Sequence, residues 1–106
     1  MDPVEFLQAW YQAQSNGHWE LSHGITIESL GNPGWLVTID LDGTPLEDRA
    51  MTAIERDVSK LDWLSCGVNR KQFRGQGDPK KLQAIMRIFQ TWAETESARA
   101  ESATGD

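Results

Sequence analysis

The segment from Ile25 to Leu41 constrains the fold more than any other part of this chain. Two runs of alternating side chains, Ile25–Leu30 and Trp35–Leu41, flank the sequence Gly31-Asn32-Pro33-Gly34. Glycine permits positive φ and proline presets its own φ, so these four residues favour a tight turn. Because successive side chains of a strand point to opposite faces, the segment predicts an antiparallel hairpin. The apolar face of its second strand consists of Trp35, Val37, Ile39 and Leu41.

Further strands are predicted between this hairpin and the C-terminal part of the chain. One lies between Arg49 and Val58, where two registers alternate equally well. Another runs from Trp63 to Asn69, and a short one around Phe73 pairs with it across a turn at Asn69-Arg70-Lys71. Short turns favour antiparallel pairing, because parallel strands need longer connections.

The last helix has the clearest sequence pattern. Asp78 is its predicted cap and Pro79 its first residue, and Gly75-Gln76-Gly77 is predicted as the turn that leads into it. A phosphate site at these glycines is disfavoured, because the Asp78 carboxylate would meet the anion at the helix N-terminus. Residues 96–106 are rich in Glu, Ser and Ala and are predicted to form a disordered tail. The apolar stripe of the helix consists of Leu82, Ile85, Met86, Phe89 and Trp92.

The N-terminus predicts a second helix, with Asp2 as its cap, Pro3 as its first residue and its end near Ser15-Asn16-Gly17. One helix, about four to five short strands and a final helix predict a single α+β domain over residues 1–95. Both helices are expected on one face of the antiparallel sheet. The other face is then open and is the natural place for a binding function.

Cysteine usage and hydropathy indicate a cytoplasmic protein. The only cysteine, Cys66, excludes an internal disulfide and fits a reducing compartment. No apolar run approaches the ~20 residues needed to cross a membrane. The first residues, Met1-Asp2-Pro3, carry no signal stretch. We therefore expect neither a membrane nor a secretory location.

The net charge of −6 is unevenly distributed along the chain. Residues 1–62 carry −8, residues 63–88 carry +5, and the remainder carries −3. A nucleic-acid binder normally has a basic face and a basic total, so nucleic acid is not an expected partner. An acidic surface suits a basic protein partner, and it is also typical of ordinary soluble proteins.

Two groups of residues suggest chemistry and are better explained by structure. His18, Glu20 and His23 could ligate zinc, but their spacing differs from that of a helical metal site, so they are interpreted as surface loop residues. Cys66 could be a nucleophile of the sulfurtransferase type. It alternates with Leu64, however, which predicts a thiol buried in the core. No metal or cofactor is therefore expected.

Several short motifs, in this order and spacing, resemble the bacterial immunity protein 53 family, whose members are small proteins found beside toxin genes. The motifs are Trp19-Glu20, Gly24-Ile25-Thr26-Ile27, Asn32-Pro33-Gly34-Trp35 and Ile39-Asp40-Leu41. Similar segments before and after them extend the resemblance over roughly nine-tenths of the chain, about the size of one domain. The resemblance implies an immunity protein of a polymorphic toxin system, which binds and neutralises a cognate bacterial toxin without catalysis.

Carboxylates and tryptophans are the candidate partner-binding residues. Exposed carboxylates at the end of a hairpin would speed association with a basic toxin, and exposed tryptophans are typical interface hot spots. Trp10, Trp35 and Trp92 instead fall on core-facing stripes. Two alternatives stay open: a small thiol enzyme centred on Cys66, and a general protein-binding adaptor. The predicted contact residues are Trp19, Glu20, Asp40, Asp42, Glu47, Asp48 and Trp63.

Overall fold

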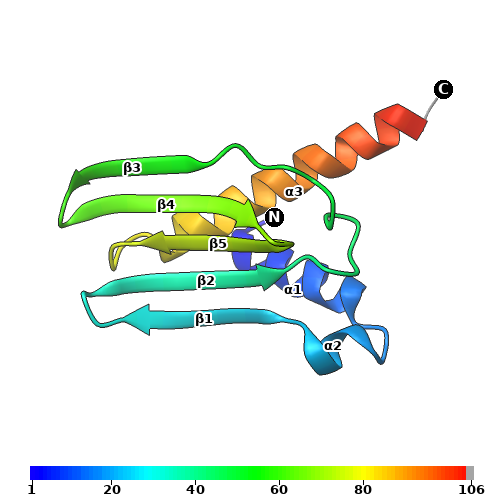
Figure 1. Cartoon of the computed structure of the whole chain (residues 1–106), viewed down its shortest axis with the longest axis horizontal. Coiled ribbons are helices and arrows are strands. Elements are labelled where there is room, and N and C mark those ends of the chain that lie inside the picture. Colours follow the sequence, from blue (N-terminus) through cyan, green and yellow to red (C-terminus); the bar gives the residue numbers. More distant parts are fainter. Residues whose placement is uncertain (105–106) are drawn as a thin grey trace.

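The structure, a computed structural model, describes residues 1–104 of the chain, which form an antiparallel sheet with helices on one side (Figure 1). This confirms the predicted α+β class. In chain order the elements are α1 (Pro3–Gln14), α2 (Trp19–Ser22), β1 (Ile25–Leu30), β2 (Gly34–Asp40), β3 (Ile54–Ser59), β4 (Asp62–Asn69), β5 (Gln72–Gly77) and α3 (Leu82–Thr104).

The strands lie in the order β1-β2-β5-β4-β3, and each neighbouring pair is antiparallel. The predicted hairpin of β1 and β2 is confirmed, and so is the pairing of β4 with β5 across the turn at Arg70 and Lys71. Residues 41–53 do not close a hairpin, however. They cross the end of the sheet and carry the chain from β2 to the far edge, where β3 pairs with β4 (Figure 1).

Side-chain alternation places one face of the sheet against α1 and α3. In the register of the strands, Ile39 of β2 lies beside Phe73 of β5, which lies beside Val68 of β4. Tryptophans also line this interior: Trp92 is buried, and Trp10 and Trp35 pack partly buried against the core, as predicted. The largest fully buried side chains are Phe73, Phe89, Ile39, Leu41, Ile85 and Val37.

The prediction that Gly75-Gln76-Gly77 forms a turn is wrong, because these residues are the end of strand β5. Gly75 lies directly beneath Ile85 of α3, so that a Cβ atom at this position would overlap the Ile85 Cγ2 atom. A Cβ atom at Gly77 would lie 2.6 Å from the Cβ of Lys81. Gly75 therefore lets α3 approach the sheet closely, and Gly77 does the same for the turn before α3, which is a packing role rather than a turning role.

The last helix begins later than predicted, at Leu82 instead of Pro79. Asp78 accepts a hydrogen bond from the Lys80 N–H at 2.8 Å, and its own carbonyl accepts from the Lys81 N–H at 3.0 Å. These bonds hold residues 79–81 in a turn before the first helical residue. Because Asp78 also accepts from the backbone N–H of Trp63 at 2.9 Å, its carboxylate joins this turn to β4.

Three further features of the secondary structure differ from prediction. Strand β3 starts at Ile54, so Met51 packs against the core from the preceding segment. A short helix, α2, occupies the loop around His18–His23. Helix α3 continues to Thr104, through most of the predicted disordered tail, where Glu96 is 6 % exposed and pairs with Arg99 at 3.6 Å. Residues 105–106 lie outside the described residues.

Candidate functional site

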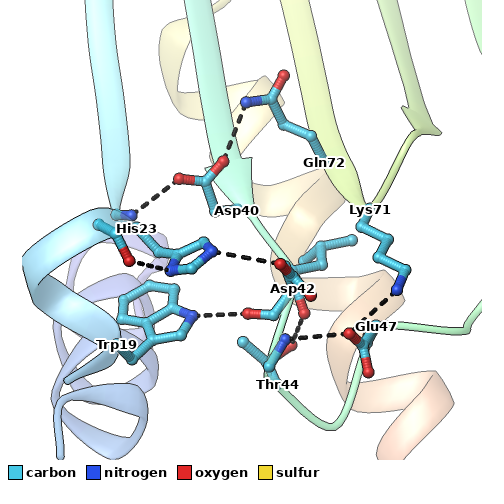
Figure 2. Close-up of polar contacts among 12 residues, drawn as sticks. Trp19, His23, Asp40, Asp42, Thr44, Glu47, Lys71 and Gln72 are labelled. Carbon is cyan, nitrogen blue, oxygen red and sulfur yellow. Dashed lines mark hydrogen bonds and ion pairs between the residues drawn. The ribbon is translucent and has the colours of Figure 1, made fainter.

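The acidic segment after β2 is held by a hydrogen bond from Trp19 and by buried hydrogen bonds within the segment itself (Figure 2). The Trp19 indole N–H donates to the Asp42 carbonyl at 2.8 Å. The Thr44 hydroxyl donates to the Leu41 carbonyl at 2.7 Å, and its oxygen accepts from the Leu46 N–H at 3.1 Å. Leu41 and Leu46 are both buried. The loop that carries the predicted acidic contacts is therefore held in a defined conformation.

Three of the four predicted acidic residues at positions 40–48 already have partners within the chain (Figure 2). Asp40 accepts hydrogen bonds from the Gly24 N–H at 2.9 Å and from the Gln72 amide at 3.0 Å. Asp42, whose side chain is 53 % exposed, lies 3.4 Å from His23 Nε2. Asp48 is exposed.

Glu47 forms the third of these contacts, an ion pair with Lys71 at 3.2 Å. This bond raises the pKa of the Lys71 ammonium above its ordinary value. Lys71 and Arg70 form the β4–β5 turn with φ of 60° and 52°, and the Lys71 carbonyl accepts from the Leu41 N–H at 2.8 Å. Such left-handed conformations are typical of two-residue hairpin turns.

The turn brings basic residues next to the acidic loop. A hollow of about 470 Å³ lies between them, and opposite charges line its walls. The charge segregation along the sequence is therefore partly cancelled at this end of the sheet. The residues that line the hollow are His23, Asp40, Asp42, Asn69, Arg70, Lys71, Gln72 and Arg74.

Trp19 supports the loop, and Glu20 holds the turn before the short helix that carries Trp19. Trp19 is 6 % exposed, stacks on the His23 ring and meets the edges of Trp10 and Tyr11. The Glu20 carboxylate accepts from the N–H groups of residues 16 and 17 at 3.0 and 2.8 Å. Hydrogen bonds from backbone N–H groups, including its own, hold the pKa of Glu20 below its ordinary value.

Trp63 lies on the open face of the sheet, opposite Asp57 of β3. Its ring covers the backbone at Gly34, where an added Cβ atom would come within 3.2 Å of the Trp63 Cζ2 atom. The residue is half-buried, and its indole N–H has no hydrogen-bond acceptor within residues 1–101. A flat, partly exposed indole with a free donor has the character of an interface anchor.

The structure does not bring Trp63 and the acidic loop together. They lie at opposite ends of the sheet, separated by the length of β2, which is roughly 20 Å. Two acidic residues outside the predicted contact set, Glu55 and Asp57, lie on the open face near Trp63 and form no ion pair in the part of the chain described. Their alternation with period two was visible, but the register of β3 was ambiguous.

Neither a metal site at His18, Glu20 and His23 nor a nucleophilic site at Cys66 is assembled in the described chain. His18 is exposed, the Glu20 carboxylate binds backbone N–H groups, and His23 turns toward Asp42. Within residues 1–104, no group of three His, Cys, Asp or Glu residues has the arrangement of a metal site. No helix in the same range has the length and hydropathy to span a membrane.

Cys66 is a core residue, as predicted. It is 2 % exposed, and burial raises the pKa of its thiol to about 12, so thiolate is scarce at neutral pH. The thiol is neither accessible to a substrate nor ionised at neutral pH, as a nucleophile would have to be.

A thiol reagent is expected to label Cys66 far more slowly in the native protein than in denaturant, by on the order of 100-fold or more. The physical reason is that both access and ionisation require the core to open. With a reagent that releases a chromophore on reaction, absorbance measures the labelling rates in the native and the denatured protein. A Cys66→Ser variant provides the blank. Rapid labelling of native protein would contradict the assignment.

The described chain is thus an α+β domain with an open sheet face, an ordered acidic loop and an interior thiol. A family model described as immunity protein 53 matches residues 4–94. The chain belongs to this family. No curated protein and no solved structure matches it. Immunity protein families are generally non-catalytic, and membership implies that the chain counters a toxin.

Proposed function

We propose that the chain binds and neutralises a cognate toxin in the cytoplasm of the bacterium that produces it, without catalysing a reaction. The family match over residues 4–94 carries this proposal. It is supported by the interior position of Cys66 and by the divergent contacts of His18, Glu20 and His23, so that these four residues do not form a reactive centre.

The contact residues proposed for this function are those that solvent can reach. Asp42 and Asp48 are exposed on the ordered loop, and Trp63 offers a partly exposed ring. Three other predicted residues are assigned a supporting role, because their side chains are already engaged: Trp19, Glu20 and Asp40. Glu47 is assigned the same supporting role, because it forms an ion pair with Lys71.

The test is co-expression with the toxin domain encoded by the gene next to that of this chain. Cells that express the toxin domain alone should stop growing, and cells that also express this chain should grow, with the two proteins co-purifying. The purified complex should lack toxin activity. Growth arrest despite expression of the folded chain would overturn the proposal, and binding without inhibition would favour an adaptor instead.

Steering by the loop carboxylates has a kinetic signature. The double variant Asp42→Asn, Asp48→Asn should associate with the toxin domain roughly tenfold more slowly at low salt, because rim charges act mainly on the association rate. Stopped-flow Trp fluorescence measures this rate. The difference should shrink at high salt, where charges are screened. An unchanged rate at low salt would remove these residues from the interface.

A further inference from the structure

Strand β3 is an unprotected edge of the sheet. It pairs only with β4 among the described elements, and all six of its residues are exposed. Its outer backbone N–H and C=O groups are therefore available to a further strand. Large apolar side chains are also exposed at this edge, with Val58 64 % and Leu61 84 % exposed.

Grooves with a largely apolar surface lie between α3 and the edge that such a strand would join. A groove of about 630 Å³ separates residues 50–54 from α3, and a second groove of about 720 Å³ continues along β3. Helix α3 passes behind the segment that leads into β3 and projects beyond the edge of the sheet (Figure 1), so part of its apolar side has no strand above it. Both grooves share Ile54, Ala84 and Ile88.

The charges on β3 indicate which strand would fit. Glu55 and Asp57 share the open face of the sheet and form no ion pair in the described chain, whereas Arg56 points to the other face and lies 3.5 Å from Asp62. Directly opposed like charges destabilise a strand pair, and opposite charges stabilise it. A neighbouring strand that carries Lys or Arg opposite these carboxylates is therefore favoured.

A second copy of this chain does not meet that requirement. The two antiparallel registers that pair most of β3 with itself are centred on Arg56 or on Asp57. The first opposes Glu55 to Asp57 of the other copy, and the second opposes Asp57 to itself. Self-pairing thus concentrates negative charge, whereas a basic partner neutralises it.

We propose that β3 accepts an extended segment of the toxin as a sixth strand, with basic side chains beside Glu55 and Asp57 and apolar ones over the groove at Ile54 and Ile88. This inference rests on the proposed toxin-binding function. It places Trp63, which lies opposite Asp57, at the margin of the same interface. Backbone pairing provides affinity in this mode, and alternate side chains provide specificity.

Hydrogen–deuterium exchange of the complex with the neighbouring gene's toxin domain tests the pairing. An added strand should slow exchange of the amides of β3 by at least about tenfold, because outward N–H groups become hydrogen-bonded. Strand β1, the other edge, serves as the internal control. Binding with unchanged exchange in β3 would overturn this inference and leave the toxin-binding function intact. Absence of binding would overturn both.

Charge-reversal variants provide the second arm. Glu55→Lys and Asp57→Lys should each weaken toxin binding at least about fivefold, as measured by isothermal titration. Glu28→Lys is the matched control, since Glu28 is also exposed on the open face, in β1, and the affinity of this variant for the toxin should change less than about twofold. If all three variants weakened binding equally, the effect would reflect the net charge of the protein rather than pairing at β3, and the proposal would be overturned. The proposal would also be overturned if the chain formed a dimer without toxin in which the β3 amides were protected from exchange.

Discussion

Replacing Gly75 with alanine is expected to destabilise the protein by about 2–3 kcal/mol, the cost of overpacking a tight core. The new methyl group would overlap the Ile85 Cγ2 atom and lie 3.2 Å from the Cys66 sulfur and 3.3 Å from a Phe73 ring carbon. Ile85 and Phe73 are fully buried, so neither can move aside without displacing other core side chains. The cost arises from forcing α3 away from the sheet.

Urea denaturation measures this effect as a lower midpoint with an unchanged slope. Gly24→Ala is the matched control, because no atom lies within 4 Å of an added Cβ there, and it should change stability by less than about 0.5 kcal/mol. Ile85→Ala should also cost less in the Gly75→Ala background than alone, since the clash is then relieved. A Gly75→Ala midpoint equal to the wild type would refute the close approach of helix and sheet.

Replacing Asp78 with asparagine is expected to lower the melting temperature at pH 7 by at least about 5 °C. The Asp78 carboxylate has no exposed surface and accepts from the Lys81 ammonium at 2.6 Å and from the N–H groups of Trp63 and Lys80. The bond from Lys81, with the backbone bonds, lowers its pKa to about 2 from an ordinary value of 3.8. The Asp78 carboxylate joins β4 to the turn before α3, so its loss loosens the attachment of both elements.

The pH dependence has a definite sign. Because folding lowers the pKa of Asp78, its carboxylate stabilises the fold fully above about pH 4, and this contribution is lost as the pH falls toward 2. Thermal melts from pH 7 to pH 2 should therefore show the wild type and Asp78→Asn converging in acid. Asp57→Asn, at an exposed position on β3, is the control and should follow the wild type. Parallel curves for wild type and Asp78→Asn would contradict the assignment.

Local patterns predicted the elements well where a single backbone period decides them. The alternation of β1 and β2 and the apolar stripe of α3 follow from side-chain direction in strands and helices, which needs no knowledge of the rest of the fold. The helix cap at Asp2 is equally local, since its carboxylate accepts from the Glu5 N–H at 2.9 Å. The interior position of Cys66 followed from alternation with Leu64 in β4.

The errors arose where distant residues decide the outcome. Gly75 and Gly77 resemble turn residues by sequence, and only the approach of α3 explains them. The acidic loop appeared to end a hairpin, but the order of the strands makes it a crossover beside Lys71. The contacts of the candidate site residues could not be predicted for the same reason: the residue types were visible in the sequence, whereas their partners within the fold were not.

The amino-acid sequence by itself determined the periodicity, the hairpin turns after β1 and after β4, and the family of this protein, because these depend on neighbouring residues and on motif order. Tertiary structure decided the order of the strands, the carboxylates that basic residues neutralise, and the exposure of the β3 edge with Glu55 and Asp57. The physical reason is that these features depend on contacts between segments far apart in the chain. Several arrangements of the strands are compatible with the local patterns, and the packing of the core selects one of them.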